Sequence, residues 1–185
     1  MQELVLEFGA PDVGRLQVAV ESSELRDIEQ ELALGRAHDV RLVILREGSV
    51  ALVKRPGSPE HACELPSGAI HPEESFVDGA ARAALAQTGR VVSIDDYLLQ
   101  LHASFEHGGS ALKWTTHVML ANPAGDDVAS PDPSLVESTE WRDWDGIRDI
   151  VIPALDAAGT APLRYQARMF ELLSGSKGVQ QKSRS

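Results

Sequence analysis

The chain has 185 residues, of which 43% are hydrophobic, and this is enough for one buried core but too little for two full-sized domains. Twenty-eight acidic and 17 basic residues give a formal net charge of −11, so the long-range field repels nucleic-acid backbones and anionic lipid surfaces. A small anionic ligand remains compatible with this charge, because backbone N–H groups and local side chains act at short range. We therefore expect no nucleic-acid partner and no membrane partner.

The only cysteine, Cys63, excludes an intrachain disulfide and predicts a reducing compartment. Its apolar neighbours favour an inert buried thiol over a nucleophile. The chain does not open on a basic segment followed by a long apolar run, and no apolar stretch reaches the roughly 18 residues of a membrane span. We expect a cytoplasmic protein.

The first half of the chain predicts strands around one helix, followed by a second helix. Residues 2–9 and 15–20 alternate apolar and polar side chains, which favours strands and allows an N-terminal hairpin. Residues 22–35 predict a helix, with Ser22 or Ser23 as its N-cap and a glycine as its stop. Residues 40–56 read as two strands joined by a tight turn at 47–48. A further helix is expected from Pro72 to Thr88, with Gly89 ending it.

The second half predicts a long hairpin, a loop, a short strand and two helices. The hairpin strands are expected over 91–106 and 112–121, with a bend or bulge near 95–96 and the turn at 108–109. A loop over 122–134, a strand over 137–144 and helices over 145–159 and 161–173 complete the elements. We divide the chain into an N-terminal extension (1–38) that could serve dimerisation, a main domain (39–174) and a disordered tail (175–185).

A motif lies between the second predicted strand pair and the hairpin. The segment 64-ELPSG-68 is followed by a five-residue gap to Glu74, a seven-residue gap to Arg82, and Gly89 after the helix. This spacing resembles the Nudix box, in which glycine, glutamate, arginine and glycine hold the same positions. The resemblance extends over most of the chain, from about residue 40 to residue 173. It implies a Nudix-type α/β/α sandwich with a mixed β-sheet. The start of the motif is similar to members that act on ADP-ribose and related nucleoside diphosphate sugars.

The motif departs from the family pattern where the family has its three helix glutamates. Here those positions hold Ala83, Ala86 and Gln87. Residues three and four apart share a helix face, so carboxylates there would converge on one divalent cation. Alanine offers no ligand, and an amide oxygen is a poor substitute for a carboxylate toward Mg²⁺. The sequence therefore predicts that the usual Mg²⁺-dependent pyrophosphohydrolase activity is lost or strongly reduced.

No remaining residue is a confident catalytic group, and no metal site is predicted. If a cation binds at all, we expect its ligands to be Glu64, the carbonyl of Ser67 and Glu74. The eight-residue separation of Glu74 and Arg82 favours an ion pair that ties the loop to the helix. The remaining candidates for catalysis are Glu64, Glu74, Asp126 and Asp127, the last two being loop acids where several family members place a general base. The predicted ligand-binding residues are Arg55, Glu64, Ser67, Gly68, Arg82 and Trp114.

Trp114 and the histidines each allow more than one interpretation. Trp114 could stack on a nucleobase or cover the sheet edge. The six histidines have no tight metal-ligand spacing, so we interpret them as scattered surface or core residues. Their positions are 38, 61, 71, 102, 107 and 117.

Three functions remain open. The first, which we favour, is a Nudix-fold protein that binds a nucleotide or nucleoside-diphosphate derivative without turning it over. The second is a divergent hydrolase for an ADP-ribose-like substrate, with Mg²⁺ as cofactor. The third is a non-catalytic homodimeric interaction module. A small anionic nucleotide-type ligand and a homodimer are the expected partners.

Overall fold

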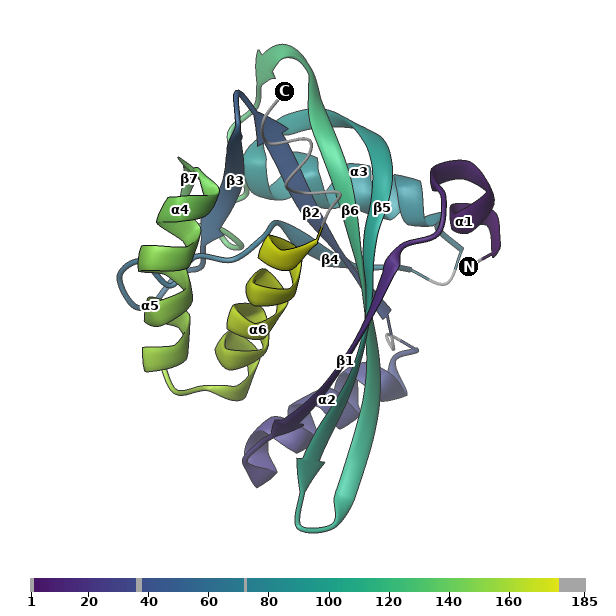
Figure 1. Cartoon of the computed structure of the whole chain (residues 1–185), viewed down its shortest axis with the longest axis vertical. Helices are drawn as coiled ribbons and strands as arrows, with labels where there is room; N and C mark the ends of the chain where they lie inside the picture. Colours follow the sequence, from purple (N-terminus) through teal and green to yellow (C-terminus); the bar gives the residue numbers. More distant parts are fainter. Residues whose placement is uncertain (1, 36–37, 72, 177–185) are drawn as a thin grey trace.

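The protein is a mixed seven-stranded sheet with helices on both faces, as seen in a computed structural model that describes residues 2–35, 38–71 and 73–176 (Figure 1). The strand order is β1-β5-β6-β2-β3-β7, and β4 pairs with β2 outside this path. The β1–β5 and β2–β6 pairs are parallel, whereas the other pairs are antiparallel. This architecture confirms the predicted fold class.

The sheet is dominated by one long hairpin, β5–β6, whose two strands supply more than half of the strand residues. Its turn, Gly108-Gly109, has φ values of +56° and +88°, which glycine adopts without strain. Register shifts fall between Ile94 and Asp96 and between Tyr97 and Leu99, as the bend predicted near residues 95–96 requires. The strands are β1 Asp12–Ala19, β2 His38–Arg46, β3 Ser49–Lys54, β4 Ser67–Ala69, β5 Arg90–His107, β6 Ser110–Val128 and β7 Ser138–Arg142.

The helices lie in two groups. Helix α3 packs on one face of the sheet, and α6 with the α4–η1–α5 segment packs on the other (Figure 1). The π-helical turn η1 lies within the predicted helix 145–159, directly before α5, whose second residue is Pro153. The helices are α1 Gln2–Phe8, α2 Ser22–Ala33, α3 Phe76–Thr88, α4 Trp144–Gly146, η1 Ile147–Val151, α5 Ile152–Ala157 and α6 Ala161–Gly175.

The prediction of an N-terminal strand over residues 2–9 is wrong, because Gln2–Phe8 form helix α1. Leu4 and Phe8 are four residues apart, so they share a helix face as readily as a strand face. Leu4 is buried in the α3-side core, with Phe8 packed against it, whereas Leu6 is 87% exposed. Over seven residues the helical and the strand period cannot be told apart from the sequence. The burial of Leu4 in the core selects the helix.

Two helix starts also differ from expectation. Helix α2 is capped by Glu21 in a capping box with Glu24, and not by Ser22 or Ser23. Helix α3 begins at Phe76 and not at Pro72, because the Ser75 hydroxyl accepts from the backbone N–H of Asp78 and so forms the N-cap.

Three further boundaries differ. The predicted loop 122–134 is strand as far as Val128, where β6 continues its pairing with β5. The predicted tail 175–185 begins inside α6, which includes Gly175. Its remaining part, 177–185, lies outside the described residues.

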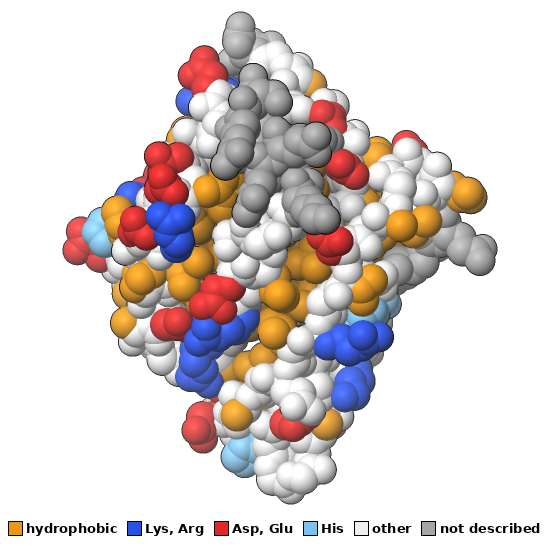
Figure 2. All heavy atoms as spheres, in the orientation of Figure 1, with side chains coloured by type: hydrophobic (Ala, Val, Ile, Leu, Met, Phe, Trp, Pro, Cys, Tyr) orange, Lys and Arg blue, Asp and Glu red, His pale blue; other side chains and the backbone are white. Residues whose placement is uncertain are grey.

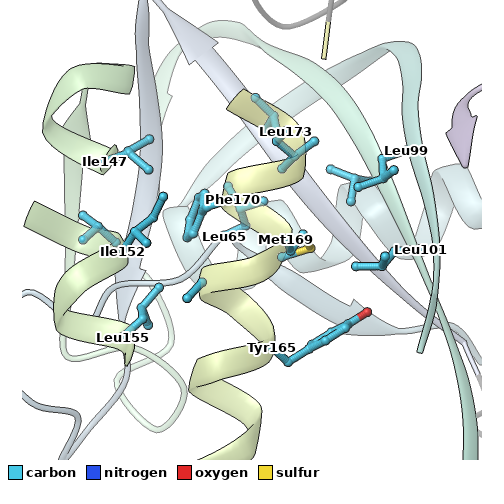
Figure 3. Packing of buried hydrophobic residues seen from close by; sticks show 14 of the residues in the cluster. Leu65, Leu99, Leu101, Ile147, Ile152, Leu155, Tyr165, Met169, Phe170 and Leu173 are labelled. Carbon is cyan, nitrogen blue, oxygen red and sulfur yellow. The ribbon is translucent and has the colours of Figure 1, made fainter. Parts of the chain in front are cut away.

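The larger core lies under α6. Tyr165, Met169 and Phe170 point from this helix toward the sheet and the neighbouring helix (Figure 3). Phe170 is fully buried, so its replacement by alanine would cost about 3–5 kcal/mol of folding free energy. The core under α3 is built from smaller side chains, and this difference sets the shape of the two faces.

Candidate functional site

Helix α3 approaches β4 unusually closely at the positions where the family has carboxylates. A methyl group added at Gly68 would lie 3.0 Å from the Cβ atom of Ala83. Ala83 is 2% exposed, so a long side chain there would have to displace β4. A methyl at Gly79 would likewise lie 2.6 Å from the side chain of Ile70. The small-residue face of α3 therefore receives β4 and its following loop, which belong to the same chain.

Gln87 closes this face with a pair of hydrogen bonds to one residue. Its Oε1 accepts from the backbone N–H of Ser67 at 3.0 Å, and its Nε2 donates to the carbonyl oxygen of Ser67. Gln87 is buried. The carboxamide thus satisfies both backbone groups of Ser67, including the carbonyl that the sequence offered as a cation ligand.

Glu74 and Arg82 form the ion pair that their spacing suggested. Arg82 Nε and Nη2 donate to the two carboxylate oxygens of Glu74, each at 2.7 Å, and Nη2 also donates to the carbonyl of Ala69 at 2.9 Å. The hydrogen bonds from Arg82 lower the pKa of Glu74 to about 2. Both side chains are engaged in holding residues 69 and 74 to α3, which leaves Glu74 poorly placed to ligate a cation.

Glu64 lies between two arginines. Its Oε1 is 3.6 Å from Arg55 Nε, and its Oε2 is 3.5 Å from Arg41 Nη1 and accepts from Gln166 Nε2 at 3.1 Å. Arg55 Nη2 also donates to the Ser67 hydroxyl at 2.9 Å. The structure therefore brings Arg55, Glu64 and Ser67 together, with the carboxylate charge already countered by two guanidinium groups.

The residues present do not fit a Mg²⁺ site. Within residues 2–35, 38–71 and 73–176 no three histidine, cysteine or acidic side chains converge to hold a metal ion. Gln87 covers the Ser67 carbonyl, and Glu64 and Glu74 are paired with arginines. Asp126 and Asp127 are residues of strand β6. The structure does not describe where their side chains lie.

Glu64 also lines a cavity of about 470 Å³. Strands β2, β5 and β6 form its floor, and helices α2 and α6 form its walls. Its lining residues are Glu24, Asp27, Ile28, Gln30, Glu31, Asp39, Arg41, Glu64, Phe105, Trp114, Ala161, Pro162, Tyr165 and Gln166. The volume is typical of small-molecule sites.

A hydrogen-bond network fixes the floor of this cavity. Asp39 accepts from Trp114 Nε1 at 2.8 Å, from the hydroxyl of Thr116 at 2.5 Å and from Arg41 Nε at 3.1 Å. Tyr165 donates to Thr116 at 2.8 Å. Trp114 therefore faces the cavity, and its hydrogen bond to Asp39 fixes its orientation. Gly68 and Arg82, also predicted to bind ligand, are not among the lining residues of this cavity.

A Tyr97–His117–His38 chain, in which Tyr97 and His117 are buried and His38 is exposed, went unnoticed in the sequence. The Tyr97 hydroxyl lies 2.5 Å from His117 Nδ1, and His117 Nε2 lies 3.2 Å from His38 Nδ1. Burial lowers the pKa of His117 to about 3. These two histidines are not scattered, and only the β2–β6 pairing, in which Val40 lies opposite His117, brings them together. No sequence spacing could have indicated it.

Comparison with known proteins places the chain in a family. The NUDIX domain matches residues 35–163, and the protein belongs to the Nudix family. The match leaves out helix α2, which precedes residue 35. No curated protein matches the chain.

The similarity to one solved structure shows the same fold, and two others are similar to a lesser degree. A NUDIX hydrolase from Nitrosomonas europaea is 18% identical with a TM-score of 0.55, and the alignment covers 76% of this chain and 90% of that protein. A UDP-X diphosphatase is 17% identical, with a TM-score of 0.47 and coverage of 68% and 61%. An ADP-ribose pyrophosphatase from Streptococcus suis is 14% identical, with a TM-score of 0.45 and coverage of 68% and 93%. Among the helices that the structure describes, none has the length and apolar character that crossing a membrane demands.

Proposed function

We propose that this Nudix-fold protein binds a nucleotide or nucleoside-diphosphate derivative and that its Mg²⁺-dependent pyrophosphohydrolase activity is lost or strongly reduced. The observation that carries the proposal is the pair of hydrogen bonds from the Gln87 carboxamide to both backbone groups of Ser67. The amide occupies the position from which a carboxylate would reach a cation.

The chemistry of an amide explains why this arrangement works against metal binding. A carboxamide presents one acceptor and one donor, which match the N–H and C=O of Ser67. A carboxylate has no donor, so it could satisfy the N–H but would face the carbonyl oxygen with a negative charge. A bridging cation resolves that conflict in an active site, whereas here the Gln87 NH₂ group resolves it without a metal.

Ligand binding is supported by the surfaces that remain open. The cavity beside Trp114 has the volume of a small-molecule site. Arg55, which is 32% exposed at its side chain, lies beside Ser67 at the edge of this region and offers a guanidinium group to phosphate oxygens. The similarity of 64-ELPSG-68 to ADP-ribose-type members makes nucleoside diphosphate sugars the first ligands to test.

One experiment separates binding from turnover. The purified protein is incubated with ADP-ribose and Mg²⁺, and both AMP release and the thermal midpoint are measured. We expect a raised midpoint, because a ligand that binds only the folded state stabilises it, together with AMP release no faster than in a reaction containing EDTA. Chelator-sensitive turnover at ordinary enzymatic rates would instead establish a divergent hydrolase. A midpoint unchanged by ADP-ribose and by other nucleotides would leave the interaction module as the better explanation.

We also propose a homodimer in which the N-terminal extension, residues 1–38, takes part. Val13 on β1 and Leu172 on α6 are 55% and 39% exposed. Hydrophobic side chains gather on the surface between α6 and β1, with charged groups around them (Figure 2). Light scattering on the purified protein tests this proposal, since a monomer at micromolar concentration would refute it.

A cytoplasmic location remains part of the proposal. Its support is Cys63, the only cysteine, which is buried. Burial raises the pKa of its thiol to about 12, so it resists oxidation as well as acting poorly as a nucleophile. Cell fractionation with a tagged chain tests the location.

A further inference from the structure

The cavity between α2 and α6 has one wall that the Nudix domain does not supply. Helix α2 precedes the matched residues 35–163, yet it contributes Glu24, Asp27, Ile28, Gln30 and Glu31 to the lining. It lies beside the first turn of α6 (Figure 1), where Glu24 Oε1 accepts from the backbone N–H of Ala161 at 2.8 Å. This wall is therefore a property of this chain and is held in place by a defined contact.

Charge is distributed unevenly around the cavity. On the floor, Arg41 lies between the carboxylates of Asp39 and Glu64, and Arg55 approaches Glu64 from outside, so acids and bases balance. On the α2 wall, the lining residues include three acids and neither lysine nor arginine. The side chain of Asp27 has no ion pair or hydrogen bond with any residue that the structure describes, and it is exposed at the rim. The wall therefore attracts positive charge into a pocket whose floor is close to neutral.

A second, independent observation comes from α6. Gln166 lines the same cavity and is 1% exposed. Its Nε2 donates to Glu64, but its Oε1 has no hydrogen-bond partner among the described residues. A buried acceptor without a donor costs about 1–3 kcal/mol, and an N–H group of a ligand would remove that cost.

The apolar part of the lining limits what kind of cation fits. Ile28, Phe105 and Trp114 contribute hydrocarbon and aromatic surface, which a hydrated metal ion cannot use but an alkyl chain can cover. An aromatic face also attracts an organic cation. A volume of about 470 Å³ accommodates a small molecule with an alkyl or aryl body.

We infer that the α2–α6 cavity binds a small organic cation, or the amine-bearing end of a larger ligand, with N–H donors directed at Gln166 Oε1 and the α2 acids and with its carbon body against Trp114. The same cavity also supports the proposed function, so a nucleotide that enters it would compete with the amine, but binding of the amine itself requires no nucleotide.

A matched set of four-carbon probes tests the inference by charge alone. 1,4-Diaminobutane, 1,4-butanediol and succinate share a carbon skeleton but carry positive, neutral and negative charge. Calorimetric titration of the full chain at low salt should show the diamine binding at least tenfold more tightly than the other two. Raising the salt concentration should weaken it, because salt screens the exposed wall. Equal binding of the diol or of succinate, or no binding of the diamine, would overturn the inference.

Variants on α2 locate the site without disturbing the core. Asp27→Lys reverses a rim charge and should weaken the diamine at least tenfold, whereas Asp27→Asn should weaken it about threefold. Glu29→Gln is the matched control, because Glu29 is exposed on the same helix and does not line the cavity; it should bind as the parent does. If Asp27→Lys binds the diamine as tightly as the parent, the cavity is not the site. Titrating ADP-ribose on the same variants keeps the two proposals apart, since either ligand can bind while the other fails.

Discussion

The two faces of the sheet differ in how closely their helices pack: the α3 face is filled by internal contacts, whereas the α6 face contains a cavity. On the α3 face, where the Nudix box lies, the small side chains of Gly68 and Ala83 let β4 and α3 meet, and Gln87 binds both backbone groups of Ser67. On the α6 face, a cavity of about 470 Å³ remains, with the Gln166 carbonyl unpaired beside it. The face that the family uses for metal chemistry is closed by internal contacts, whereas the neighbouring cavity is open.

The difference follows from the chemistry of the side chains at the box positions. A cluster of carboxylates is a source of charge repulsion, which a bound cation relieves. Methyl groups and an amide remove the repulsion and the need for the cation together, and they add packing and hydrogen bonds. An unsatisfied polar group such as Gln166 Oε1 marks the opposite situation, in which the protein leaves a place for a partner. The comparison predicts that changes on the α3 face affect stability, whereas changes around the cavity affect binding.

The largest expected effect concerns the buried His117 on the α3 side of the sheet. Its folded pKa of about 3 lies below the usual 6.5, so the unfolded chain takes up a proton that the folded chain refuses. The stability linked to His117 is complete above pH 6.5 and is lost as the pH falls toward 3, at about 1.4 kcal/mol per pH unit and roughly 5 kcal/mol in all. Urea unfolding at pH 7.5, 6.5 and 5.5 measures this slope.

Two variants show whether His117 causes that slope. His117→Gln should flatten it, leaving a smaller slope from His38, whose pKa burial also lowers. Tyr97→Phe removes the hydroxyl that contacts His117 but leaves the imidazole of His117 in place. This variant should therefore retain the slope of stability against pH, even if it lowers stability at every pH. A slope that survives His117→Gln unchanged would show that other groups control acid unfolding.

The second effect is expected at Gln87. Gln87→Glu removes the donor to the Ser67 carbonyl and places a negative charge against it, which should lower the unfolding free energy at pH 7 by about 3 kcal/mol. Mg²⁺ should restore part of that loss in the variant and should leave the parent unchanged, because only the variant offers a carboxylate beside the Ser67 carbonyl. Denaturant unfolding with Mg²⁺ and with EDTA measures both.

A matched control is Ala86→Glu. Ala86 lies one residue from Gln87 and is only half-buried, and this variant keeps the amide bound to Ser67. It should change stability little and show no response to Mg²⁺. If Gln87→Glu is as stable as the parent without a metal, the hydrogen-bond pair does not close the site.

A smaller effect is expected from the ion pair of Glu74 and Arg82. The folded pKa of Glu74, about 2, lies below its usual 4.5, so its contribution is complete above pH 4.5 and is lost as the pH falls through 2. Solvent reaches Arg82, whose side chain is 43% exposed, so we expect about 2 kcal/mol in total. Glu74→Gln should lose this amount at pH 7 and show a shallower decline between pH 4.5 and 2. If the unfolding free energy of Glu74→Gln declines between pH 4.5 and 2 as steeply as that of the parent, Glu74 does not contribute to stability in acid.

The sequence was sufficient for much of the fold and for the α3 side of the site. Fixed spacings revealed the box, and the helix period placed residues 83, 86 and 87 on one face; Gly89, at φ +69°, ends α3 as expected. Local patterns cannot show how strands far apart in the chain align. That limit explains why the His38–His117 contact, the hydrogen bonds of Gln87 to Ser67 and the cavity between α2 and α6 emerged only from the structure. The prediction for residues 2–9 was wrong for another reason: over seven residues the apolar pattern fits the helical and the strand period equally well.

The smallest stability effect is expected at the cavity, where the comparison between the faces is most direct. Trp114→Phe keeps an aromatic ring but removes the Nε1 donor to Asp39. Asp39 retains Arg41 and Thr116 as donors, so the unfolding free energy should fall by only about 1 kcal/mol. Affinity for 1,4-diaminobutane should fall further, because the ring loses the orientation that its hydrogen bond to Asp39 maintains. Denaturant unfolding and calorimetry on one sample compare the two. A variant that loses several kcal/mol of stability while binding the amine as before would mean that Trp114 belongs to the core and that the α6 face, like the α3 face, is structural.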